Sequence, residues 1–123
     1  MARILVAEDE DTIRNLIARA LTQDGHEVIA AQDGAEALDL FTREDGAFAL
    51  LLTDIRMPVM DGIALALAAA RSHPEVPILL MTGYADQRER ADGLNALIHD
   101  VITKPFSLGE FRAAVKRALG AGS

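Results

Sequence analysis

The chain has 123 residues, of which 50% are hydrophobic and 25% charged, a balance typical of one folded domain. Its net charge of −7 disfavours nucleic acid and anionic membranes as partners, and the absence of cysteine excludes disulfides and thiol chemistry. The N-terminus does not look like a signal peptide, and no apolar run is long enough to span a bilayer, so we expect a cytoplasmic protein.

Short apolar runs alternate along the chain with longer amphipathic segments. The short runs are rich in Val, Ile and Leu and predict five strands, at residues 4–7, 27–31, 49–53, 76–81 and 100–103. The first, third and fourth runs are almost continuously apolar, which is typical of strands buried on both faces of a parallel sheet.

The segments between these runs carry helical signals. The first places an apolar stripe at Ile13, Leu16, Ile17, Ala20 and Leu21. Helix caps are predicted at Asp33, Asp61 and Ser107, and the first and last of these precede a Glu by three residues, as in a capping box. The fourth helical segment, residues 86–97, is polar and contains Gly93.

Five strands and five helices in strict alternation predict an α/β fold, a doubly wound parallel sheet with helices on both faces. In such folds ligands bind beyond the carboxyl ends of the strands. The residues directly after each predicted strand are therefore the candidates for function.

Three carboxylates, a hydroxyl and an ammonium group follow the predicted strands. They belong to Glu8 and Asp9 after the first, Asp54 at the third, Thr82 after the fourth and Lys104 after the fifth. Clustered carboxylates repel one another unless a cation joins them, and oxygen ligands favour Mg²⁺. Lys104 and Thr82 are the groups needed to hold a transferred phosphoryl group, and Asp54 is the candidate nucleophile.

Each of these residues also has a structural explanation. Acidic residues such as Glu8 and Asp9 are favoured at a helix N-terminus, and Asp54 stands where a turn is expected. A single Thr82 or Lys104 is an ordinary strand-end or surface residue. It is their combination at successive strand ends that favours a phosphoryl-transfer site.

The segments around these positions resemble the receiver domain of two-component response regulators, the CheY-like, flavodoxin-like fold with strand order 2-1-3-4-5. The resemblance covers residues 3–119 and is carried by AEDE (7–10), LTDIRMPVMDG (52–62), MTG (81–83) and TKPF (103–106). It implies a single receiver domain over residues 1–123, without an output domain.

The resemblance implies a role for each site residue. Asp54 would be the phospho-acceptor, and Thr82 and Lys104 would contact the phosphoryl group. The Lys104–Pro105 peptide bond would be cis. The ligands of Mg²⁺ would be Asp9, Asp54, the main-chain carbonyl of Arg56 and, through water, Glu8.

Four positions give the site its own character. Glu8 stands where the family usually has Asp and keeps the negative charge. Val101 stands at the usual aromatic switch position, and a valine cannot swing between buried and exposed rotamers with the same effect. Arg56 and Tyr84 should flank the phosphoryl group, and we expect the Tyr84 ring to shield it from attacking water.

The implied function is signalling rather than turnover. A histidine kinase or histidine phosphotransfer protein would supply the phosphoryl group, and the chain would catalyse only its own phosphorylation and dephosphorylation. The phosphate would switch a surface that binds a downstream protein. The segments MTGYADQRERA (81–91) and KPFSL (104–108) are further similar to the CpdR-type regulators, which implies a link to proteolysis by ClpXP.

Three alternatives stay open at this point. A Mg²⁺-dependent phosphatase with an Asp nucleophile often has a second acid two residues later, where this chain has Arg56. A flavodoxin-like cofactor protein needs a Ser/Thr/Gly-rich phosphate loop after the first strand, where this chain has acids. A receiver fold that binds proteins without phosphate is compatible with Val101.

Overall fold

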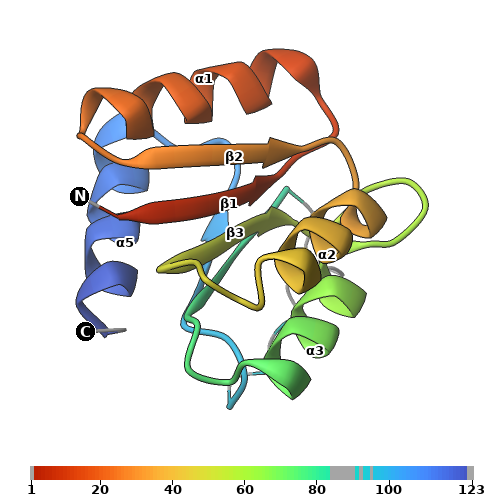
Figure 1. The fold of residues 1–123 in the computed structure, drawn as a ribbon. Coiled ribbons are helices and arrows are strands. Elements are labelled where there is room, and N and C mark those ends of the chain that lie inside the picture. The colour runs from red at the N-terminus through yellow and green to blue at the C-terminus, as the bar shows by residue number, and fades with distance from the viewer. Residues whose placement is uncertain (1, 84–90, 92, 95, 122–123) are drawn as a thin grey trace.

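The computed structural model describes residues 2–83, 91, 93–94 and 96–121. Its elements are β1 (Arg3–Ala7), α1 (Asp11–Gln23), β2 (Glu27–Ala31), α2 (Gly34–Arg43), β3 (Leu50–Asp54), α3 (Gly62–Ser72), β4 (Ile78–Thr82), β5 (Asp100–Thr103) and α5 (Leu108–Ala121). The strands form one parallel sheet in the order β2-β1-β3-β4-β5, which confirms the predicted fold class (Figure 1). Most of the predicted fourth helix lies outside the described residues.

The central strands are buried along their whole length, as their apolar sequences predict. Every residue of β3 and β4 is buried, and Asp54 at the end of β3 pairs with Met81 of β4. The predicted start of β4 was wrong by two residues, because Pro77 precedes the strand. Proline lacks the N–H that a ladder needs, and here only the carbonyl of Pro77 bonds to β3, by accepting from Leu51 N–H at 3.0 Å.

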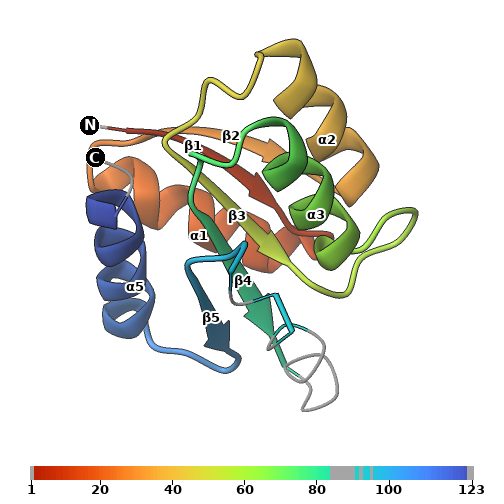
Figure 2. The ribbon, with the colours of Figure 1, turned by 90° about the horizontal axis from the view of Figure 1, so that it is seen from below.

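Two hydrophobic cores lie on opposite faces of the sheet. Alternate residues of β1 point to opposite faces, so Leu5 packs with α2 and α3, while Ile4 packs with α1 and α5. Figures 1 and 2 show the same division, with α1 and α5 on one face and α2 and α3 on the other. Both faces are thus covered by helices, and the strand ends are left for a site.

The predicted helix caps are confirmed. Asp33 accepts a hydrogen bond from Glu36 N–H at 2.8 Å, Asp61 accepts one from Ala64 N–H at 2.9 Å, and the hydroxyl of Ser107 accepts one from Glu110 N–H at 3.0 Å. Each cap satisfies a main-chain donor that the first helical turn leaves without a partner. Among the described residues, no helix has both the length and the apolar character needed to cross a membrane.

The first turn of α3 packs directly against the end of β3. Gly62 N–H donates to the carbonyl of Ile55 at 2.7 Å, and a Cβ atom at Gly62 would overlap the main-chain carbonyl of Asp54. Only glycine allows this approach. The packing therefore fixes the main chain of Asp54 from the α3 side.

We expect Gly62→Ala to lower the free energy of unfolding by about 1–3 kcal/mol, because the added methyl group must displace main-chain atoms rather than a side chain. Urea unfolding measures the change. Gly109→Ala is the control, since a Cβ there meets only the hydroxyl of Ser107 at 3.8 Å. Equal losses in both variants would show that overlap at Asp54 is not the cause.

Candidate functional site

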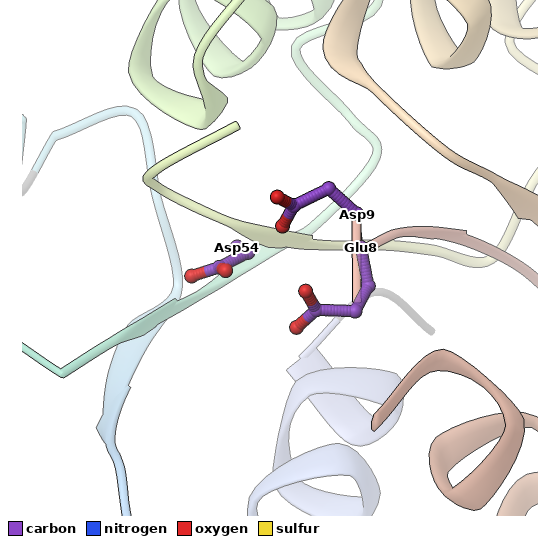
Figure 3. Close-up of side chains that lie close together, drawn as sticks. All are labelled: Glu8, Asp9 and Asp54. Carbon is purple, nitrogen blue, oxygen red and sulfur yellow. The ribbon is translucent and has the colours of Figure 1, made fainter. Parts of the chain in front are cut away.

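Three carboxyl groups meet at the carboxyl ends of β1 and β3. One oxygen from each of Glu8, Asp9 and Asp54 lies within 4.8 Å of the other two. Figure 3 shows Glu8 and Asp9 arriving from the segment after β1 and Asp54 from the end of β3. Glu8 and Asp54 are buried and Asp9 is exposed, so the cluster has an inner wall and one side open to solvent.

Lys104 brings a positive charge to this cluster from the end of β5. Its Nζ lies 3.0 Å from Glu8 Oε1 and 3.1 Å from Asp54 Oδ2, so one ammonium group bridges two strands. The main-chain N–H of Lys104 donates to the carbonyl of Thr82 at 2.7 Å, which ties the ends of β4 and β5 together. The Lys104–Pro105 peptide bond is cis, as the resemblance implies.

The carboxylate of Glu8 is fully buried and held on both oxygens. Oε1 accepts from Lys104, and Oε2 accepts from Glu10 N–H at 3.1 Å. Burial, together with the negative charge of Asp54, raises the pKa of Glu8 to about 7, and the bonds from Glu10 and Lys104 offset only part of this effect. The site therefore holds more negative charge than its own donors neutralise.

Burial and the neighbouring charges also shift the pKa values of Asp54 and Lys104. Burial raises the pKa of Asp54, and the nearby charge of Asp9 adds to this, while Lys104 acts in the opposite direction. Burial alone lowers the pKa of Lys104, but the charges of Asp54 and Glu8 outweigh it and raise the pKa above its usual value. The ammonium group thus contacts two of the three clustered carboxyl groups, a donor set that suits a hard divalent cation.

A cavity of about 690 Å³ opens beside the cluster. Its lining divides into a charged part and an apolar part. The charged part includes Asp9, Asp54, Arg56 and Lys104, and the apolar part includes Ile13, Leu16, Pro105 and Phe106. The Phe106 ring stacks on that of Phe111, with centroids 5.5 Å apart, so the apolar wall is anchored to the α1/α5 core.

The remaining candidate residues are spread around the cluster. Thr82 is buried at the end of β4, beside Met81, whose strand partner is Asp54. Arg56 is exposed after β3. Val101 is half-buried on β5 and packs against the α2/α3 core, away from the carboxylates. Tyr84 lies outside the described residues, so its shielding role stays a prediction.

One residue that lies near the site, Arg14, was not predicted from the sequence. The guanidinium of Arg14, in α1, donates from Nη1 to the main-chain carbonyl of Glu8 at 3.0 Å and pairs with Asp11. Its only sequence signal is a cation close to a helix N-terminus, where the helix dipole favours acids instead.

Comparison with known proteins identifies the family. Residues 4–116 match the response regulator receiver domain, and the chain therefore belongs to this family. It is 42% identical over 118 residues to the regulatory protein AtoC of Escherichia coli K12, covering 95% of this chain and 25% of AtoC. It is 37% identical over 119 residues to the response regulator receiver protein CpdR of Brucella abortus, covering 97% of this chain and 98% of CpdR.

The solved structures extend the likeness to three dimensions. The response regulator TrrA of Thermotoga maritima, determined in complex with Mg²⁺-BeF, superposes with a TM-score of 0.85 at 32% identity, covering 96% of this chain and 99% of TrrA. The fold is thus that of the CheY-like receivers. The chain spans between a quarter and half of the length of AtoC and the ycf27 regulators that it matches.

The raised pKa of Glu8 predicts a pH-dependent stability without added metal. The folded protein keeps a proton on Glu8 up to about pH 7, whereas the unfolded chain releases it near 4.5. The free energy of unfolding should therefore fall as the pH rises from about 4.5 to about 7, with a slope of up to about 1.4 kcal/mol per pH unit for one proton. The raised pKa of Asp54 acts in the same direction.

Urea unfolding in EDTA across this pH range tests the prediction. Glu8→Gln should flatten the slope, because the amide cannot titrate. Glu75→Gln, which removes an exposed carboxylate from the α3–β4 loop, should leave it as in wild type. A wild-type stability that rises over the same range would contradict the assignment.

Proposed function

We propose that this chain is a receiver of a two-component phosphorelay, acting in the cytoplasm, in which Asp54 accepts a phosphoryl group from a phosphohistidine donor. The donor is a histidine kinase or a histidine phosphotransfer protein. The observation that carries the proposal is the convergence of Glu8, Asp9 and Asp54 with the ammonium group of Lys104 at one edge of the sheet. Membership of the receiver family supports it.

The donor set at this edge fits Mg²⁺. Its carboxylate oxygens lie within 4.8 Å of one another, and burial disfavours their unneutralised charge. Asp9, Asp54 and the carbonyl of Arg56 would hold the ion, with Glu8 assisting through water. When bound, Mg²⁺ supplies positive charge that offsets the charge of the phosphoryl oxygens. The presence of Mg²⁺-BeF in the TrrA structure supports Mg²⁺ binding by this chain as well.

The side chains of this chain perform the transfer in the proposal. A carboxylate oxygen of Asp54 forms a bond to phosphorus as the bond between phosphorus and the donor imidazole nitrogen breaks, and the electron pair stays on that nitrogen. Lys104, 3.1 Å from Asp54, neutralises the phosphoryl oxygens, and the Thr82 hydroxyl donates a hydrogen bond to one of them. In the proposal, Arg56 and Tyr84 set how fast water removes the group.

The readout of the proposal is protein binding. A phosphate of about −2 charge on Asp54 draws Lys104 and Thr82 toward it and favours one of two surface states around β5 and α5. Val101 replaces the usual aromatic side chain, so the change passes through the main chain of Lys104 and Thr82. The match over 98% of CpdR supports a CpdR-like role in proteolysis by ClpXP.

Intact-mass analysis with a small acyl-phosphate donor, or with a phosphorylated histidine phosphotransfer protein, tests the acceptor. Wild-type protein should gain one phosphoryl group with Mg²⁺ and lose that gain in EDTA. Asp54→Asn should gain none. Asp39→Asn, which removes an exposed acid from α2, should behave as wild type. A wild type that both donors leave unmodified, or an Asp54→Asn protein that is modified, would contradict the proposal.

Binding to ClpX tests the CpdR-like role. We expect the affinity of wild-type protein for ClpX to change about 5-fold or more between the beryllofluoride-treated and untreated forms, which is the usual size of coupling between two sites. Asp54→Asn should show no such change. Absence of ClpX binding in both forms would overturn the CpdR-like role alone, while equal binding in both would overturn the switch.

A further inference from the structure

The start of α1 holds a largely buried cation that the proposed mechanism does not use. The side chain of Arg14 is only 15% exposed, although it lies close to the helix N-terminus, where the dipole disfavours positive charge. Its guanidinium donates from Nη1 to the main-chain carbonyl of Glu8 at 3.0 Å, and Nη2 pairs with Asp11. The first contact connects the helix back to the residue that follows β1, and the second lies within the first turn of α1.

The turn between β1 and α1 is held by one hydrogen bond at each successive peptide unit. Glu8 N–H donates to the carbonyl of Ala31 at 3.1 Å, and Glu10 N–H donates to the carboxylate of Glu8 at 3.1 Å. The carbonyl of Glu10 accepts from Arg14 N–H at 2.8 Å. The remaining peptide unit joins Glu8 to Asp9, and its carbonyl, that of Glu8, accepts a hydrogen bond from the guanidinium of Arg14.

This placement has a geometric consequence for Asp9. A peptide unit is planar, so a bond to its carbonyl oxygen restrains the whole unit, including both of its Cα atoms. The direction in which the Asp9 side chain leaves the main chain is set by that plane. Two peptide units flank the exposed Asp9: the Asp9–Glu10 unit is held through Glu10 N–H, and the Glu8–Asp9 unit is held by the Arg14 bond. Loss of Arg14 would therefore release one of the two units that orient the Asp9 side chain.

We propose that Arg14 is a positioning residue for the cation site: it orients the Glu8–Asp9 peptide so that the Asp9 carboxylate faces Asp54. The inference rests on the proposed Mg²⁺ site. A different explanation is that Arg14 only neutralises the acidic run from Glu8 to Asp11. The two explanations predict opposite signs, because a nearby guanidinium repels Mg²⁺ by its charge but aids binding by positioning.

Calorimetric titration of the full chain with Mg²⁺ distinguishes the positioning role of Arg14 from simple charge neutralisation. Arg14→Gln removes the charge and the forked contact. Arg14→Lys keeps the charge but lacks the planar fork that reaches the Glu8 carbonyl and Asp11 together. We expect both variants to bind Mg²⁺ about 10-fold more weakly, the usual effect of losing a residue that orients a ligand. Arg19→Gln removes the same charge from an exposed position of α1 and should bind as wild type or slightly more tightly.

The outcomes distinguish this inference from the proposed function. If Arg14→Gln binds Mg²⁺ more tightly and Arg14→Lys binds as wild type, Arg14 acts by charge alone and the positioning role is overturned. If wild type binds no Mg²⁺, or Asp9→Asn binds as well as wild type, the cation site itself is overturned. Far-UV circular dichroism under the titration conditions confirms that each variant is folded, and Arg14→Lys tests the proposal if Arg14→Gln unfolds.

Discussion

The ammonium group of Lys104 contacts the carboxylates of both Glu8 and Asp54, and the electrostatics of the site depend on it. Burial, with the mutual repulsion of the carboxylates added to it, raises the pKa values of Glu8 and Asp54 although Lys104 acts in the opposite direction, and added positive charge would offset this effect. A protein selected only for stability would replace such a cluster with apolar residues. Its presence at a strand end is consistent with the proposed phosphoryl-transfer site.

The sheet supplies the rigidity that this arrangement needs. Glu8, Asp54 and Lys104 come from the ends of three different strands, and their side chains can meet only because parallel strands end at the same edge. Covered faces exclude water from β3, and the close approach of Gly62 fixes the main chain of Asp54 from the other side. Asp54 is therefore positioned by the fold, while the exposed Asp9 is positioned by its local turn.

The parts that were predictable from the sequence are those that leave a periodic or short-range pattern. The apolar runs predicted the strands, and Asp33, Asp61 and Ser107 predicted their caps because a cap is a local contact. The strand order came from the family resemblance, since alternation alone does not specify it. Arg14 was missed because its partner is a main-chain carbonyl, which has no sequence signature, and the raised pKa of Glu8 depends on burial by distant segments.

Lys104 takes part in the structure twice, through its side chain and through its main chain. The Nζ atom is bonded to residues that end β1 and β3, and the N–H of the same residue is bonded to the last residue of β4. One residue therefore links the acidic cluster, through its side chain, to the junction of β4 and β5, through its main chain. If Asp54 is phosphorylated as proposed, a displacement of the ammonium group reaches the main chain of β4 through Lys104 itself, so the proposed switch does not need a rotating aromatic ring.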